Sequence, residues 1–180
     1  LEGDGDEGYH GYDGPLAVAK SDRRDDILLD RFIEAGQQAG FALTDDFNGR
    51  QQEGFSRYEH TMKGARRCSA AKAYLHPAKD RPNLTIVSHA SVERIMFTNR
   101  RATAIDVVVK GQKETFVARK EIILCAGALN SPQILLRSGI GPADEMQPHG
   151  IEVVHALPGV GQNLQDHIGV VSQFACTQPI

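Results

Sequence analysis

The stretch EIILCAGALNSPQILLRSGIG spans residues 121–141 and decides the fold class. Its first five residues have no polar face after the glutamate. Such a run predicts a strand that is buried on both sides of a parallel sheet, with Cys125 in the core. The small residues that follow, Ala126, Gly127 and Ala128, predict a tight turn at the carboxyl end of this strand, where a ligand can approach the backbone closely.

A helix is expected after this turn. Asn130 or Ser131 can cap it, Pro132 suits its first turn, and Gly139 ends it. A buried strand that leads through small residues into a helix is the repeating unit of an α/β fold. From the residues alone, a tightly packed unit without any ligand explains the pattern as well as a binding site does.

The segments before this unit predict two helices and a β-meander. One helix is expected from Asp25 or Asp26 to a stop at Gly40, and a second from Cys68 to His76, ended by Pro77. Residues 1–25 and 45–65 are expected to be irregular. The short segments rich in β-branched residues are Leu84–Ala90, Val92–Thr98, Ala102–Lys110 and Glu114–Arg119, with turns at Asn99-Arg100 and Gly111-Gln112.

The bulk composition excludes several classes of protein. The 180 residues have a formal net charge of -3, which gives no electrostatic case for binding nucleic acid. The longest uncharged apolar run is far shorter than the roughly 20 residues of a membrane span. The three cysteines form no C-x-x-C pair and the seven histidines have no ligand spacing. The sequence therefore favours a reducing compartment and predicts no metal site.

The chain opens with GDGDEG at residues 3–8, which matches the phosphate-binding pattern G-x-G-x-x-G. No strand can precede it within this sequence, and the following YHGYDGP cannot open a helix. Its variable positions, Asp4, Asp6 and Glu7, would repel phosphate. A later bidentate carboxylate, which a calcium loop requires, is also lacking. We interpret this motif as a solvated acidic loop.

Gly127 to Gly141, GALNSPQILLRSGIG, resembles the second signature of the glucose–methanol–choline (GMC) oxidoreductases. The shared features are a small pair, a following Ser-Pro, two aliphatic residues and a final Ser-Gly-aliphatic-Gly. Other segments resemble choline-dehydrogenase-like members in their usual order, so the resemblance covers nearly the whole chain. These segments are GYDGPLAV (11–18), DFNGRQQEGFSRYEHTMKGARRCSAAKAYL (46–75), RPNLTIVSHASVERI (81–95) and LPGVGQNLQDH (157–167).

The resemblance implies a segment of an FAD-dependent oxidoreductase that oxidises the CH–OH group of a small, choline-like alcohol by hydride transfer. The implied fold class is α/β, or α+β for the fragment alone. Residues 1–77 would be a substrate-domain portion, 78–165 the middle of a parallel-sheet FAD domain with its β-meander, and 166–180 the return to an antiparallel substrate sheet. The electron acceptor would be a quinone or oxygen. The location would be cytoplasmic, with or without peripheral contact to the inner membrane.

Six residues match cofactor-binding positions of the family. The resemblance implies that the backbone of Val92 binds the adenine edge, although a valine of a strand core fits the sequence equally. It also implies that the strand end and turn pass close to the diphosphate and ribose, and that the loop before His167 lies near the flavin. The six residues are Val92, Cys125, Ala126, Gly127, Ala128 and Asn163.

No catalytic residue is assigned within the chain. The resemblance implies that the phosphate-binding glycines precede Leu1 and that the histidine base follows Ile180. His167 is the best local candidate, but the histidine of its motif is not the family's base. We expect the chain alone to bind FAD weakly or not at all and to be inactive. A non-catalytic fragment or binding module without cofactor, and an FAD-containing lyase of the same fold, are the alternatives.

Overall fold

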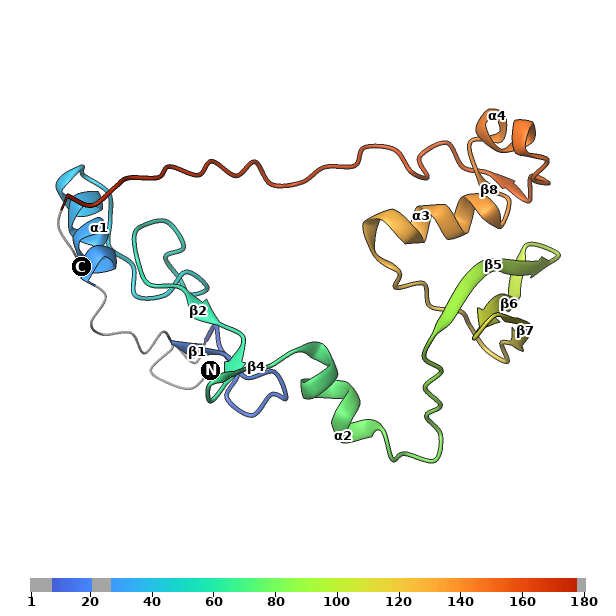
Figure 1. Ribbon diagram of the computed structural model, residues 1–180, viewed down its shortest axis with the longest axis horizontal. Helices are drawn as coiled ribbons and strands as arrows, with labels where there is room; N and C mark the ends of the chain where they lie inside the picture. The colour runs from blue at the N-terminus through green and yellow to red at the C-terminus, as the bar shows by residue number, and fades with distance from the viewer. Residues whose placement is uncertain (1–7, 21–26, 178–180) are drawn as a thin grey trace. The chain divides into compact units, whose positions relative to one another are not determined.

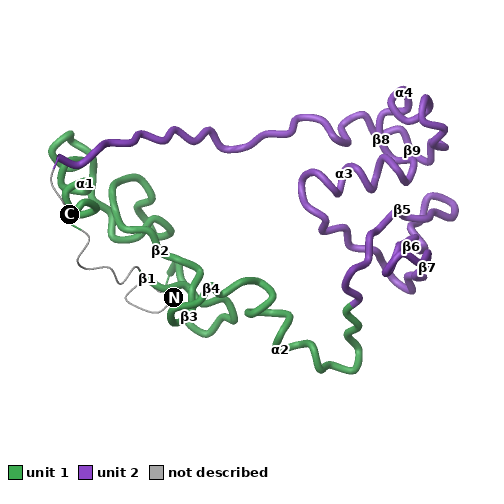
Figure 2. Tube along the Cα trace, viewed as in Figure 1, with its two compact units in different colours: residues 1–86 green, residues 87–180 purple. Residues whose placement is uncertain are grey.

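The computed structural model describes residues 8–20 and 27–177, and their order of helices and strands is drawn in Figure 1. The chain divides into two compact units, residues 1–86 and 87–180 (Figure 2). Each unit is considered by itself. The division into portions 1–77, 78–165 and 166–180 stays a prediction. The acidic motif at residues 3–8 lies outside the described residues except for Gly8.

The first unit contains one long helix and two pairs of very short strands. Helix α1 spans Ile27–Gln38, and Gly40 follows it at φ 89°, which confirms the predicted helix and its stop. The two residues proposed to begin this helix lie outside the described residues. Four strands form antiparallel pairs, β1 with β2 and β3 with β4. Their bounds are Ala19–Lys20, Glu59–His60, Met62–Lys63 and Arg66–Arg67.

Three aromatic rings attach α1 to the irregular segment that follows it. The Phe55 ring lies on Gly36, so closely that a Cβ at Gly36 would be 2.6 Å from a ring carbon. Phe55 also contacts Phe32 and Phe41, with ring centroids 5.4 and 5.5 Å apart. The missing side chain of Gly36 therefore lets the ring of Phe55 pack directly on the helix backbone.

Two polar contacts attach the N-terminal loop of this unit. The Ala17 N–H donates to Sγ of Cys68, whose thiol is buried, at 3.4 Å. His10 Nε2 lies 2.5 Å from Asp46 Oδ2, and the Asn48 N–H donates to the other carboxylate oxygen at 2.8 Å. The hydrogen bond from His10, more than the other contacts, holds the pKa of Asp46 below its ordinary value of 3.8.

The second predicted helix is displaced by two to three residues. Its first turn is a π-helix, Ala71–Leu75, which continues as α2, His76–Ala78. The Cys68 N–H donates to the Thr61 carbonyl, which keeps this residue outside the helix. Pro77 does not end the helix, because it is the second residue of α2 and the helix continues to Ala78.

The second unit begins with the predicted β-meander. Strands β5 (Ala90–Thr98), β6 (Arg101–Val109) and β7 (Gln112–Val117) are antiparallel in the order β5-β6-β7. Both connections are two-residue turns in which each residue has positive φ, as in type I′ hairpins. Asn99 and Arg100 have φ of 50° and 65°, and Lys110 and Gly111 have φ of 49° and 84°. The second turn thus lies one residue earlier than predicted.

Two predicted strands are absent from the described part of the chain. Leu84–Ala90 is irregular until Ala90 begins β5, and Glu121–Cys125 forms no strand, with Ile123 74% exposed and Cys125 exposed. A strand persists through hydrogen bonds to a neighbouring strand, and among the described residues none forms a β-bridge with residues 84–89 or 121–125. The expectation that Cys125 is buried is therefore wrong for this structure. The overall mixture of helices and strands confirms the expected class.

Helix α3, Gly127–Arg137, begins three residues before the predicted caps and ends at Gly139 as predicted. Gly139 has φ 83°, and a Cβ there would lie 2.2 Å from the Glu152 carbonyl oxygen. The segment after it forms the parallel pair β8 (Ile140–Gly141) and β9 (His155–Ala156). A short helix α4 (Ala143–Met146) and a 3-10 turn (Gln147–His149) lie between them. The close backbone approach explains why glycine ends α3.

Residues 162–177 contain no helix or strand. Four of their large apolar side chains are almost fully exposed: Ile168 (96%), Val170 (86%), Val171 (83%) and Phe174 (91%). These four residues are called the apolar tail below.

Candidate functional site

The turn before α3 is held by a serine four residues into the helix. The Ala126 N–H donates to Ser131 Oγ at 3.1 Å, so the hydroxyl satisfies an amide that the helix cannot. Gly127 has φ 84°, a conformation that favours glycine. A Cβ on Gly127 would meet no atom within 4 Å, so the backbone of this turn faces open space. The sequence reasoning identified Ser131 as a cap and missed that the helix starts before it.

A cavity of about 530 Å³ lies between α3 and the loop at residues 161–165. It brings together two predicted cofactor residues, Ala128 and Asn163, which are far apart in the sequence. Asn163 has φ 56° and Gly161 has φ 79°, so the loop depends on two left-handed residues. The cavity is lined by Ala128, Leu129, Pro132, Gln133, Leu136, Gly161, Gln162, Asn163, Leu164 and Gln165.

The chemistry of this cavity is neutral. The helix contributes mostly apolar side chains, and the loop contributes the amides of Gln162, Asn163 and Gln165. Its lining residues include no acid, base or histidine. Such a surface can bind a large ligand by apolar contact and by hydrogen bonds from amides, but it supplies no group for proton transfer.

The other predicted cofactor residues lie outside this cavity. Cys125 and Gly127 are exposed and Ala126 is half-buried, directly before the helix that forms the cavity wall. Val92 is half-buried on β5 and pairs with Val107, which is 2% exposed. Two of the six residues are therefore brought to one cavity, three precede it in the turn, and Val92 lies on the neighbouring sheet.

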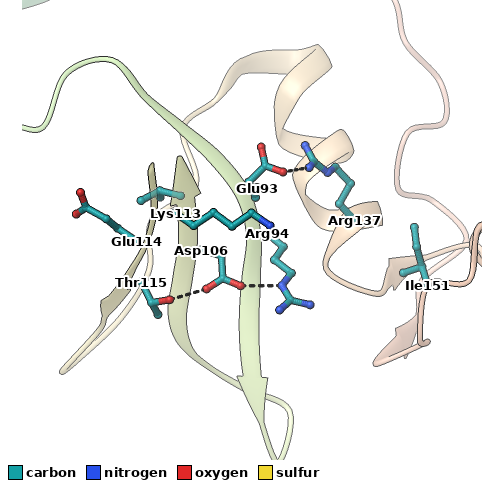
Figure 3. Close-up of a pocket in the computed structure, with 9 residues that line it drawn as sticks. Glu93, Arg94, Asp106, Lys113, Glu114, Thr115, Arg137 and Ile151 are labelled. Carbon is teal, nitrogen blue, oxygen red and sulfur yellow. Dashed lines mark hydrogen bonds and ion pairs between the residues drawn. The ribbon is translucent and has the colours of Figure 1, made fainter. Parts of the chain in front are cut away.

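A second cavity of the same unit, about 570 Å³, has a charged lining (Figure 3). Arg94 Nε donates to Asp106 Oδ2 at 2.9 Å, and Thr115 Oγ1 donates to Asp106 Oδ1 at 2.8 Å. The hydrogen bond from Arg94, followed by that from Thr115, holds the pKa of Asp106 below its usual value. Glu93 forms an ion pair with Arg137 of α3 at the side of this cavity.

We call Arg94, Asp106 and Thr115 the charged ladder, because they are joined across three neighbouring strands. The sequence reasoning missed it. Once the two hairpin turns are assigned, the register aligns Arg94 with Asp106 and Asp106 with Thr115 on neighbouring strands. The signal was therefore present in the meander. Because every member is already paired, the ladder stabilises the sheet by cross-strand contacts and resembles no proton-transfer site.

His167 has an exposed side chain, and its backbone N–H donates to the Asp166 carboxylate at 2.8 Å. Residues 8–20 and 27–177 contain no group of three or more His, Cys, Asp or Glu side chains that could hold a metal ion. Among the helices of these same ranges, none has the length and apolar character to cross a membrane.

Comparison with known proteins identifies the family. The model of the family described as GMC oxidoreductase matches residues 5–169. An oxygen-dependent choline dehydrogenase from Ectopseudomonas mendocina is 48% identical over 179 residues, which cover 98% of this chain and 32% of that protein. The chain thus spans about a third of the length of such curated relatives.

Two solved structures share the fold. Pyridoxine 4-oxidase from Mesorbium loti is 32% identical with a TM-score of 0.77, covering 83% of this chain and 29% of that one. An FAD-dependent oxidoreductase from Chaetomium thermophilum is 29% identical with a TM-score of 0.82, covering 90% and 28%. Since the family model matches far more than half of its residues, this chain belongs to the GMC oxidoreductases.

Proposed function

We propose that this chain is the central segment of an FAD-dependent oxidoreductase that oxidises the CH–OH group of a small, choline-like alcohol. The observation that carries the proposal is the neutral cavity between α3 and the 161–165 loop, which Ala128 and Asn163 both line. GMC oxidoreductases are FAD-dependent flavoproteins. The identity of 48% to an oxygen-dependent choline dehydrogenase supports the substrate class. Oxygen or a quinone would be the electron acceptor.

In the proposal, the residues of this chain bind parts of a large cofactor whose two planar ring systems are joined by a polar chain. The open backbone at Gly127 and the amide-rich loop offer close approach and hydrogen bonds without charge. In the proposal, Cys125, Ala126, Gly127 and Ala128 form the turn against which the cofactor lies. Asn163 contacts it from the loop and Val92 from β5. When bound, the flavin supplies the chemistry of hydride acceptance.

We assign no catalytic base to the chain. Oxidation of an alcohol requires that its hydroxyl proton be taken by a base within hydrogen-bond reach of the oxygen. His167, the best local candidate, has an exposed side chain and is not among the residues that line the cavity at α3. The proposal therefore places the base in the remaining part of a longer protein.

The proposed domain division follows the same reasoning. Residues 1–77 would belong to the substrate side and 78–165 to the FAD domain. Residues 166–180 would return to the substrate sheet. The exposure of the apolar tail supports this last assignment, because such side chains are normally covered by a neighbouring element.

The test compares two proteins, the chain of 180 residues and the longer protein that contains it. Each is incubated with FAD and desalted, and its visible flavin absorption is recorded. We expect the longer protein to retain flavin and choline to bleach it without oxygen, whereas the chain alone loses it. A longer protein without flavin would refute the proposal. Bound flavin that no alcohol reduces would favour the lyase alternative, and flavin retained by the chain alone would refute its expected weak binding.

A further inference from the structure

Strand β5 is an edge strand of the meander, and one of its outward backbone amides donates to the residue that directly follows α3. The Ile95 N–H donates to Ser138 Oγ at 2.8 Å. The same hydroxyl donates to the Ile134 carbonyl at 2.5 Å, so it binds strand and helix at once. Ile95, Ile134 and Ser138 are each only 6–7% exposed. Without this hydroxyl a buried N–H of the strand would have no acceptor, which is unfavourable.

A second contact joins β5 to α3, two residues earlier on the strand and one residue earlier along the helix. The register of β5 against β6 shifts between Val92 and Arg94, so Glu93 is the extra residue of a β-bulge. Glu93 forms an ion pair with Arg137, the last residue of α3 (Figure 3). The bulge thus lets a side chain of the strand reach the last turn of α3, which Ser138 directly follows.

We propose that Glu93, Arg137 and Ser138 form a clamp that positions the cofactor-binding segments, an inference that rests on the proposed function. Val92 directly precedes the clamped residue of β5, and Ala128 lies at the opposite end of α3. A helix transmits position over such a length, about 15 Å for ten residues, as a rigid rod. The clamp therefore sets the separation between the strand that bears Val92 and the turn before Ala128.

The three clamp residues are positioning residues, since none lines the neutral cavity. Their loss would leave the residues that line that cavity unchanged. The distance between the cavity and Val92 would, however, be less tightly fixed. The direct consequence is weaker binding of a ligand that must contact both segments at once, because binding then has to restore the lost order.

The test uses the longer, flavin-loaded protein with the variants Ser138→Ala and Ser138→Thr. We expect Ser138→Ala to raise the FAD dissociation constant about tenfold and to abolish the hydrogen-exchange protection of the Ile95 amide. Ser138→Thr keeps a hydroxyl and restores both properties. The matched control is Thr103→Val, which removes a hydroxyl that donates to the Met96 carbonyl within the meander rather than to a group of α3. It should leave the dissociation constant unchanged.

The partly exposed ion pair provides an independent test if Ser138→Ala does not fold. Glu93→Arg and Arg137→Glu should each weaken FAD binding, and the double exchange should recover it. Wild-type FAD affinity in Ser138→Ala and in both charge variants would overturn the clamp while leaving the proposed function standing. A wild-type protein that binds no FAD would instead overturn the proposed function, and the clamp's role with it.

Discussion

Asp46 connects two loops of the first unit through a single carboxylate. It accepts from His10 on one oxygen and from the Asn48 amide on the other, and its pKa is lowered in the folded chain. A carboxyl whose folded pKa lies below its unfolded value stabilises the fold above the unfolded pKa. That contribution is lost as the pH falls through the folded pKa.

We therefore predict that the free energy of unfolding of the first unit falls as the pH drops below about 4. Asp46→Asn should remove roughly 1 kcal/mol at neutral pH and flatten the acid dependence. Urea unfolding followed by circular dichroism at several pH values measures both. Asp45→Asn, which removes an exposed neighbouring carboxylate, controls for net charge. An unchanged acid dependence in Asp46→Asn would contradict the prediction.

Gly36 offers a second test at the scale of one residue, because two effects oppose each other there. Alanine in a helix interior is favoured over glycine by about 0.5–1 kcal/mol. The Cβ would, however, lie 2.6 Å from the Phe55 ring, and overpacking costs about 1–3 kcal/mol. We expect Gly36→Ala to destabilise the first unit in urea unfolding. Gly14→Ala, where an added Cβ would contact no atom within 4 Å, should leave the stability nearly unchanged. A stabilised Gly36→Ala would contradict the prediction and show that the Phe55 ring moves aside.

At the scale of the element, the turn between β5 and β6 contains a residue whose backbone conformation lowers the stability of the fold. Arg100 has φ 65°, a left-handed conformation that is unfavourable for a residue with a Cβ. Arg100→Gly would create Asn-Gly, the preferred pair for a type I′ turn. We predict stabilisation of about 0.5–1 kcal/mol, seen as a higher urea midpoint. Arg101→Gly, one residue later inside β6, should lower the midpoint instead.

The elements that could be predicted from sequence are those that depend on local signals. Helix α1 has apolar periodicity and a glycine stop, and the meander has β-branched runs separated by short turns. Residues 84–89 and 121–125 have equally good strand patterns but form no strand, because a strand also requires a partner. The early start of α3 depends on one hydroxyl, Ser131, reaching back to Ala126, which no periodicity reveals.

The candidate site was predictable to a similar degree. The small residues at 126–128 and the loop around Asn163 could be identified from the sequence. That Ala128 and Asn163 line one cavity is seen only in the three-dimensional structure. The position of Val92 on a different element, and the serine that joins that strand to α3, are products of tertiary structure. Spacing along the chain contains no information about such contacts.

At the scale of the whole molecule, the apolar tail dominates how the isolated chain should behave. Its side chains are 83–96% exposed, and the net charge of -3 gives little repulsion between copies. We predict concentration-dependent association of the 180-residue chain, measured by light scattering. The double variant Val171→Thr with Phe174→Ser should reduce it, whereas the polar exchange Gln173→Ser should not. Equal scattering from both would contradict the prediction.

The different exposure of the three thiols allows local unfolding of the first unit to be followed in the native chain. Cys125 and Cys176 are exposed, whereas Cys68 is buried beneath the N-terminal loop of the first unit. An alkylating reagent should modify two thiols at once and the third only at the rate at which that unit transiently unfolds. The third labelling phase would therefore report how often the first unit opens around Cys68, without any engineered probe.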